Sequence, residues 1–339
     1  SVAAQGLKFT SFAVGGGTPL ILDEGQLEEL FCLAELFGVH PSRVFTSVET
    51  SPEYTQKSVL RQLRARGVER LSMGVQSFNE TELKKLKRRP GLGTVVGALE
   101  NIVEAGFPQF NLDLIYGIEG QTVESFMRSL NTALTYRPNE LFIYPLYVRP
   151  GTRIDVRSTD DIGYAIYKSA RELLVGQGFV QTSMRRFVRR ETTETEFSCG
   201  DEVMLSCGAG GRSYLGNLHY ATPYAVRQQA IADEIDHYIR TTDFMTAANG
   251  FLLSTEEMQI RFIIKNLMYH RGVDLAEYEK RFGEKPDRNL FREFTDRGWI
   301  EETGRIVRLT EEGMAYSDYI GQAFISPVVR KLMSEYVYP

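Results

Sequence analysis

The chain has 339 residues, with 39 Lys and Arg against 44 Asp and Glu and a formal net charge of −5. This length predicts two domains, or one barrel with an appendage. The acidic balance argues against nucleic-acid binding and against binding to an anionic membrane, because phosphate groups favour basic surfaces. No apolar run approaches the roughly 18 residues of a membrane-spanning helix, so we expect no membrane-spanning segment. The three cysteines are odd in number and match no zinc or iron–sulfur spacing, which favours a reducing, cytoplasmic setting.

The first half of the sequence alternates short runs rich in β-branched residues with helical patterns. We expect strands at 7–14, 44–50, 70–77, 111–116 and 141–148, and helices at 23–37, 53–66, 79–88, 94–105 and 123–136. Strands separated by helices indicate βα units around a parallel sheet. Five units in about 150 residues favour a partial (β/α)6 TIM-type barrel, with a doubly wound sheet as the alternative. Asp23 with Gln26 and Asn79 with Glu82 have the spacing of capping boxes.

The second half is less periodic. We expect a helix at 160–175, a strand at 179–188, a glycine-rich stretch at 205–216 and a helix at 223–239. Further helices at 256–269, 275–282 and 288–297 precede a hairpin at 300–309 and a helix at 310–320. The sequence therefore predicts a barrel with its extension at 1–250 and a helical, winged-helix-like module at 251–339. That module is slightly acidic, which favours packing as a lid or buttress over a role in DNA binding.

Polar and glycine residues gather where the predicted strands end. Gly15, Gly16, Gly17 and Thr18 directly follow the first strand, where free N–H groups and missing side chains let a ligand approach the backbone. A tight βα turn is the simpler interpretation of the glycines alone. In the next three units, Glu49, Gln76 and Asp113 lie at or near strand ends. In a parallel barrel these positions converge on the carboxyl-terminal face, where sites are built.

These stretches occur in an order that resembles a known family. Gly-Gly-Gly-Thr-Pro at 15–19, Glu-Thr-Ser-Pro at 49–52, Arg-Leu-Ser-Met-Gly-Val-Gln-Ser-Phe-Asn at 70–79 and Asn-Leu-Asp-Leu-Ile-Tyr-Gly at 111–117 are similar to the radical S-adenosylmethionine (SAM) proteins related to oxygen-independent coproporphyrinogen III oxidase. Tyr-Pro-Leu-Tyr-Val-Arg-Pro-Gly-Thr at 144–152 and Cys-Gly-Ala-Gly-Gly-Arg-Ser-Tyr at 207–214 fit the same family, so the resemblance covers nearly the whole chain.

The resemblance implies a cofactor site and a class of chemistry. Gly15, Gly16, Gly17 and Thr18 would line the methionyl end of SAM. Glu49, Gln76, Arg88 and Asp113 match family positions that contact the cofactor, with Asp113 on the ribose hydroxyls and Arg88 on the methionyl carboxylate, and the backbone near Tyr147 would meet adenine. A 5′-deoxyadenosyl radical would abstract hydrogen from a small organic substrate, such as a tetrapyrrole. An electron donor such as flavodoxin or ferredoxin would supply the electron.

The family resemblance leaves alternatives open, because other branches methylate substrates or carry haem as chaperones. The family also holds a [4Fe–4S] cluster on a CxxxCxxC loop, whereas this sequence has only Cys32, Cys199 and Cys207. None of them forms that loop, so we expect no metal ligands and no radical activity in the chain as given. Cys32 is expected to be a buried helix residue. The start of the sequence within a predicted strand favours truncation of the first βα unit over a degenerate family member.

Two further clusters have a weaker functional interpretation. Arg185, Arg186, Arg189 and Arg190 alternate along a predicted strand, where one pair could bind substrate carboxylates and a solvated edge strand is the simpler alternative. His219 follows the glycine-rich stretch and could reach the mouth of the barrel. A surface or core histidine is the simpler interpretation there.

Overall fold

The computed structural model describes residues 8–87, 91–147, 160–189, 203–223, 225, 227–244 and 249–336. The chain divides into two compact units. The first holds the described residues up to 147 together with 160–180 and 185–189, and the second holds 181–184 and the described residues from 203 onward. Within these ranges no helix combines the length and the apolar character needed to cross a bilayer.

The first unit is built on a seven-stranded sheet in the order β1-β2-β3-β4-β5-β7-β6. Its strands are β1 (Ser11–Val14), β2 (Phe45–Thr50), β3 (Arg70–Gln76), β4 (Gln109–Tyr116), β5 (Glu140–Pro145), β6 (Phe179–Gln181) and β7 (Arg186–Arg189). Strands β1 to β5 pair in parallel and in chain order, and β7 pairs antiparallel with β5. This is the expected partial-barrel arrangement of consecutive βα units, and the alternative of a doubly wound sheet is wrong.

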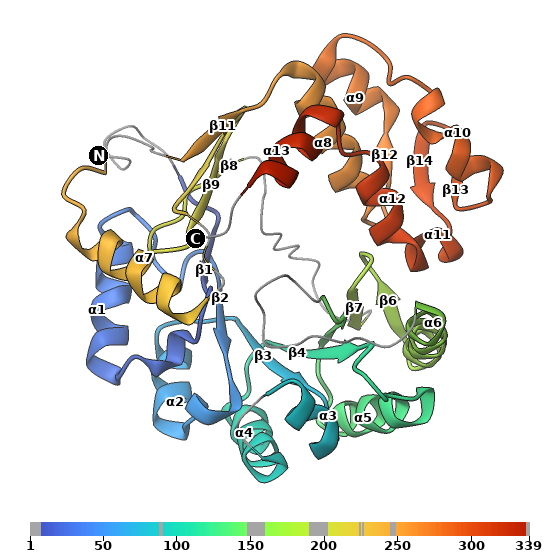
Figure 1. Ribbon diagram of the computed structural model, residues 1–339. Coiled ribbons are helices and arrows are strands. Elements are labelled where there is room, and N and C mark those ends of the chain that lie inside the picture. Colours follow the sequence, from blue (N-terminus) through green and yellow to red (C-terminus); the bar gives the residue numbers. More distant parts are fainter. Residues whose placement is uncertain are drawn as a thin grey trace. The chain divides into compact units, whose positions relative to one another are not determined.

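Helices cover one side of this sheet (Figure 1). They are α1 (Glu24–Glu35), α2 (Lys57–Ala65), α3 (Glu80–Lys85), α4 (Leu92–Ala105), α5 (Val123–Thr135) and α6 (Asp160–Gly176), with short 3₁₀ turns η2 (Pro19–Ile21) and η3 (Pro52–Tyr54). Side chains alternate between the two faces of a strand. Val48, Leu71, Leu112 and Leu141 are fully buried on one face, and polar residues occupy the other.

The two predicted capping boxes have different outcomes. Asp23 and Gln26 exchange both bonds of the motif at the start of α1, as expected. Asn79 caps α3 by accepting from the backbone of Thr81 and Glu82, but the Glu82 side chain does not return the bond. The capping box at α3 is therefore wrong, because the Glu82 carboxylate turns into the core instead.

The second unit contains an antiparallel sheet and a helical module. The sheet has the order β11-β10-β9-β8, formed by Gly250–Leu252, Leu218–Ala221, Arg212–Leu215 and Val203–Met204, and α7 spans Gln228–Arg240. The module contains the three expected helices, α8 (Thr255–Leu267), α9 (Leu275–Phe282) and α10 (Asn289–Asp296), and the expected hairpin of β13 (Ile300–Thr303) and β14 (Ile306–Leu309). Strand β12 (Val273–Asp274) joins the hairpin as a third strand. A continuous apolar core holds the module together.

Two expected elements differ in detail, and one helix was not expected. The strand expected at 179–188 is interrupted, because backbone groups at its centre pair elsewhere: Met184 N–H donates to Met268 O, and Thr182 O accepts from His270 N–H. The helix expected at 310–320 is two helices, α11 (Glu311–Ala315) and α12 (Ser317–Ala323), separated at Tyr316. Helix α13 (Pro327–Glu335), capped by Ser326, was not expected. The expected boundary near residue 250 between two domains stays a prediction.

Candidate functional site

The glycine run after β1 lies against the end of the neighbouring strand. Gly16 has a φ of +91°, and its N–H donates to Glu49 Oε2 at 3.3 Å. A Cβ placed on Gly15 would lie 2.7 Å from the Glu49 carboxyl carbon, whereas one on Gly17 would meet nothing within 4 Å. Only a glycine at position 15 therefore leaves room for the Glu49 carboxylate. Gly17 and the following Thr18 complete the turn into η2.

Gln76 closes β3 in an unusual conformation. Its φ is +74°, and the pairing register between β3 and β4 shifts between Gly74 and Gln76. Non-glycine residues seldom adopt a positive φ, so the turn here is held by its surroundings. The side-chain amide folds back over Gly74, where an added Cβ would lie 2.5 Å from Gln76 Nε2. Gly74 pairs with Asp113, so the amide of Gln76 lies beside Asp113 on the polar face.

Asp113 points to the polar face of β4, two residues after Asn111 and flanked by Gly74 and Phe142. Asn111 Nδ2 donates to Asp113 Oδ1 at 2.7 Å. Burial raises the pKa of Asp113 to about 6, against the lowering effects of the Asn111 hydrogen bond and of Arg70. Glu49 adds a smaller raising effect, which places the two carboxylates in one electrostatic environment. Burial also raises the pKa of Tyr144 on β5, with Asp113 as the second cause.

A buried ion-pair network lies deeper on the same face. Glu140, 1% exposed, accepts from Arg70 Nε at 2.7 Å and also pairs with Arg186. Arg70 further donates to Ser47 Oγ at 3.0 Å. Two guanidinium groups thus surround one carboxylate, and the three side chains tie β3 to β5 and β7. Arg186 is engaged inside the sheet, so the hypothesis that it binds a substrate carboxylate is wrong for this residue.

The other arginines of that cluster are engaged with neighbouring groups. Arg185 is buried and donates to the hydroxyls of Tyr147, at 2.9 Å, and Tyr116, at 3.4 Å. Arg189 donates to Pro138 O and stacks over the ring of Phe179. Arg190 lies outside the described residues.

Two of the predicted site residues need separate mention. Tyr147 lies two residues after the carboxyl end of β5 and is half exposed. Its hydroxyl accepts a hydrogen bond from Arg185, and the contact of its backbone with adenine stays a prediction. Arg88 falls outside the described residues, and its contact with the cofactor stays a prediction.

The spacings of the three cysteines do not match the CxxxCxxC loop of the family. Cys32 is exposed on α1, with Arg66 Nη2 3.8 Å from its sulfur, so the expectation of a buried residue is wrong. The register of α1 places Leu27 and Phe31 in the core and turns position 32 outward. Cys207 is exposed in the second unit, and Cys199 is outside the described residues. Among the described side chains no cluster of three His, Cys, Asp or Glu could hold a metal ion.

Four residues of the polar face were missed: Arg70, Ser72, Asn111 and Glu140. Arg70 and Ser72 alternate with Leu71 and Met73 along β3. Asn111 likewise precedes Asp113 by two positions on β4. A period-two pattern of polar residues inside an otherwise apolar strand predicts one polar face. This alternation is the signal in the sequence that identifies the four residues.

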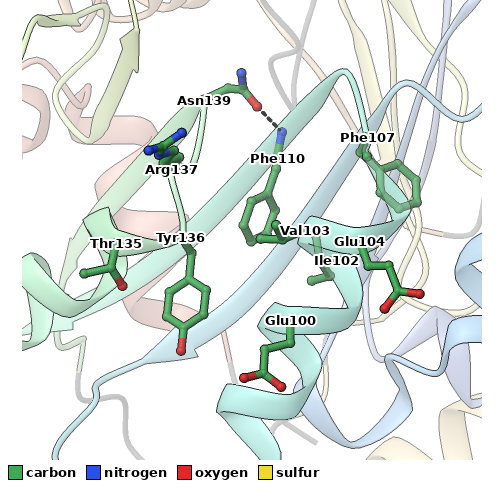
Figure 2. Close-up of a pocket in the computed structure, with 11 residues that line it drawn as sticks. Glu100, Ile102, Val103, Glu104, Phe107, Phe110, Thr135, Tyr136, Arg137 and Asn139 are labelled. Atoms are coloured by element: carbon green, nitrogen blue, oxygen red, sulfur yellow. Dashed lines mark hydrogen bonds between the residues drawn. The ribbon is translucent and has the colours of Figure 1, made fainter.

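A cavity of about 670 Å³ lies at the opposite end of the strands, between the ends of α4 and α5. Figure 2 shows its lining residues, among them Phe107, Phe110 and Tyr136, and the bond from Phe110 N–H to Asn139 Oδ1 at 3.0 Å. These residues precede or begin β4 and β5, at the amino-terminal edge of the sheet. Sites in parallel sheets form at the carboxyl ends, so this cavity is not the site predicted from the sequence.

His219 belongs to the second unit, on β10, with its ring edge-on to Tyr214. Burial, followed by the charge of Arg261, lowers the pKa of His219 to about 4. The imidazole is therefore neutral at physiological pH. That it reaches the mouth of the barrel stays a prediction.

Comparison with known proteins gives two family matches. The Radical SAM superfamily model matches residues 3–133, and the HemN C-terminal domain model matches residues 253–316. The solved structure of coproporphyrinogen III oxidase (HemN) from Escherichia coli superposes with a TM-score of 0.75 at 22% identity, covering 93% of this chain and 77% of that chain. At this identity the likeness shows the fold.

Curated relatives carry two different names. A Bacillus subtilis protein named heme chaperone HemW is 27% identical over 92% of this chain and 84% of its own length. A Salmonella typhimurium protein named oxygen-independent coproporphyrinogen III oxidase is 35% identical over 79% of this chain, but the match spans only 62% of that protein.

Proposed function

Because the chain belongs to the radical SAM superfamily, in the branch that includes HemN-type proteins, we propose that the polar face of its parallel sheet binds S-adenosylmethionine. The observation that carries this is the contact between the glycine run and Glu49, beside Asp113 on the same face. Because Gly15 has no side chain, the Glu49 carboxylate packs against it. The backbone of Gly16 and Gly17 would then be open to a ligand, since neither residue carries a side chain.

The residues present fit the chemistry of that cofactor. Carboxylates of Glu49 and Asp113 accept hydrogen bonds from amine and hydroxyl groups, which SAM carries on its methionyl end and ribose. The amide of Gln76, on the strand between those of Glu49 and Asp113, offers hydrogen-bond donors and an acceptor. We assign Asp113 to the ribose hydroxyls, Arg88 to the methionyl carboxylate, and the backbone at Tyr147 to adenine. When bound beside a reduced iron–sulfur cluster, SAM supplies one-electron hydrogen-abstraction chemistry. This sequence holds no family-type cluster ligands, so no step is assigned through the cluster.

We further propose a cytoplasmic protein that acts on a small organic substrate with an external reductant such as flavodoxin or ferredoxin. The carboxylates of Glu49 and Asp113 would hold the cofactor. The buried ion-pair network of Arg70, Glu140 and Arg186 would keep the strands in register. The module at 251–339 would serve as a lid or buttress.

The binding role is tested with Asp113→Asn. Asparagine keeps one acceptor oxygen and replaces the other with a donor, which leaves a ribose hydroxyl without its partner at a cost of about 1–3 kcal/mol. We expect SAM to bind about 5- to 150-fold more weakly by calorimetric titration. Asp161→Asn, the same change at an exposed position of α6, is the matched control and should bind normally. Equal affinity of Asp113→Asn and the wild type would remove Asp113 from the site.

Haem binding is the second candidate function. It is favoured by the relative named heme chaperone, because the match to that protein covers 92% of the present chain. Titration with haem under reducing and oxidising conditions separates the candidates. A saturable Soret band with one haem per chain, unaffected by Asp113→Asn, favours haem carriage. SAM binding that depends on Asp113, without saturable haem binding, favours the enzyme.

A further inference from the structure

Asn111 contacts the proposed ribose-binding carboxylate directly. Its Nδ2 donates to Asp113 Oδ1 and to Ser72 Oγ, each at 2.7 Å. Both hydrogens of the amide are thereby used, and the residue is completely buried. Ser72 lies on β3 opposite Asn111, so the amide links the Asp113 side chain to a fixed position on the neighbouring strand.

The same side chain carries an unpartnered acceptor. Asn111 Oδ1 is buried and has no hydrogen-bond partner among the residues that the structure describes. Turning the amide over would not help, because it would place this oxygen against the Asp113 carboxylate and lose both donated bonds. A buried acceptor without a partner destabilises the fold, and an apolar residue of the same shape avoids that cost. Asn111 thus leaves one acceptor unsatisfied, while its amide group orients Asp113.

We propose that Asn111 is a positioning residue that fixes the Asp113 carboxylate for ligand binding, an inference that rests on the proposed function. With one carboxylate oxygen held by Asn111, the plane of the carboxylate is set and the second oxygen is left for a ligand. Preorganisation of this kind lowers the entropic cost of binding.

The hydrogen bond also favours the ionised carboxylate. Burial and two acidic neighbours raise the pKa of Asp113, and the Asn111 bond and one basic neighbour lower it. The charged or titratable groups that face Asp113 are Glu49 on β2, Arg70 on β3, and Glu140 and Tyr144 on β5. None of them contacts Asp113 through a hydrogen bond in the described part of the chain, so removal of the Asn111 amide leaves the carboxylate without its direct donor.

The test uses Asn111→Leu, which keeps the branched shape and removes the amide. We expect SAM to bind about 5- to 20-fold more weakly at pH 7. Affinity is measured on folded protein, because Asp113 and Ser72 lose the donor that Asn111 supplies and stability can fall as well. The midpoint of the binding-against-pH curve should rise by at least about half a pH unit, because the neutral acid becomes easier to form. Asn101→Leu is the control. Asn101 lies on helix α4, and its Nδ2 donates one partly buried hydrogen bond to Thr55 O at 3.0 Å. It should leave affinity and the pH curve unchanged.

A second variant, Ser72→Ala, removes the other acceptor that holds the amide. It should produce a smaller upward shift of the pH midpoint and a smaller fall in affinity, about 2- to 5-fold, because the bond from Asn111 to Asp113 is loosened but not removed. If Asp113→Asn weakens SAM binding but Asn111→Leu and Ser72→Ala change neither affinity nor the pH curve, the positioning role is overturned. If Asp113→Asn itself has no effect, the ribose role of Asp113 fails instead, so the two failures are distinguishable.

Discussion

Glu140 Oε2 lies 2.7 Å from Nε of Arg70, a residue 70 positions earlier in the chain and two strands away. Strand β4 runs between them, so the pair spans the interior of the sheet beneath Asp113. Arg186 pairs with the same carboxylate from β7. Removal of one partner from such a buried network leaves an uncompensated charge.

Glu140→Gln should therefore lower the free energy of unfolding by about 3–5 kcal/mol. Glu119→Gln removes a carboxylate that is exposed and lies 3.9 Å from Lys85, and it should change stability by less than about 1 kcal/mol. Urea unfolding followed by far-ultraviolet circular dichroism measures both. Similar small losses in the two variants would mean that the buried network does not hold the sheet together.

Gly15→Ala tests the packing of the glycine run against Glu49. The added Cβ meets the mobile end of the Glu49 side chain, so the carboxylate must swing away while the backbone stays in place. We expect a change in stability within about 0.5 kcal/mol but clearly weaker SAM binding, on the order of tenfold. Gly17→Ala places its Cβ in open space in the ligand-free chain and should leave the Glu49 carboxylate in position. Unaltered affinity in Gly15→Ala would separate Glu49 from the site.

The raised pKa of Asp113 predicts a pH-dependent stability effect. From pH 4 to 6 the folded state retains a proton that the unfolded chain has lost, so stability falls as pH rises through this window. Asp113→Asn removes this loss and should be more stable than the wild type at pH 7.5, by at most about 3 kcal/mol. The difference should disappear near pH 4. Thermal melts across this pH range check it, and a variant that is less stable at pH 7.5 would contradict a destabilising buried charge.

Glu82 joins three segments at the carboxyl ends of β3 and β4. Its buried carboxylate accepts from Ser77 Oγ at 2.5 Å, Gln121 Nε2 at 2.9 Å and Ser125 Oγ at 2.6 Å. Glu82→Leu leaves these donors without their acceptor and should cost about 1–3 kcal/mol or more of stability. Glu80→Leu, on the exposed side of the same helix, is the matched control and should be nearly neutral. Equal effects at the two positions would show that the network contributes no stability.

The sequence patterns predict the barrel well because each strand is short, bounded by turn residues and separated from the next strand by a helical pattern. The glycine run, Glu49 and Asp113 could be selected because they lie at strand ends or match family motifs. The contact of Gly16 with Glu49 agrees with that selection. The break at 182–185 could not be predicted, since it depends on backbone pairing with Met268 and His270 far along the chain.

The partners of polar side chains inside the core could also not be predicted from the sequence. Asn79 and Glu82 have the spacing of a capping box, but Ser77 and the more distant Gln121 and Ser125 compete successfully for the Glu82 carboxylate. The sequence makes Arg186 a candidate for substrate binding, but its ion pair with the buried Glu140 decides against that role. In both cases local spacing was correct and a tertiary partner decided the outcome.

A crystal structure of the chain with S-adenosylmethionine tests the central claim most directly, through the distances from the ribose hydroxyl oxygens to the Asp113 carboxylate. We predict at least one distance below about 3.2 Å, with Asn111 still bonded to the other carboxylate oxygen and the methionyl group beside Gly16 and Gly17. Binding in the cavity between α4 and α5, or on the polar face with Asp113 contacting only Asn111, would contradict the account.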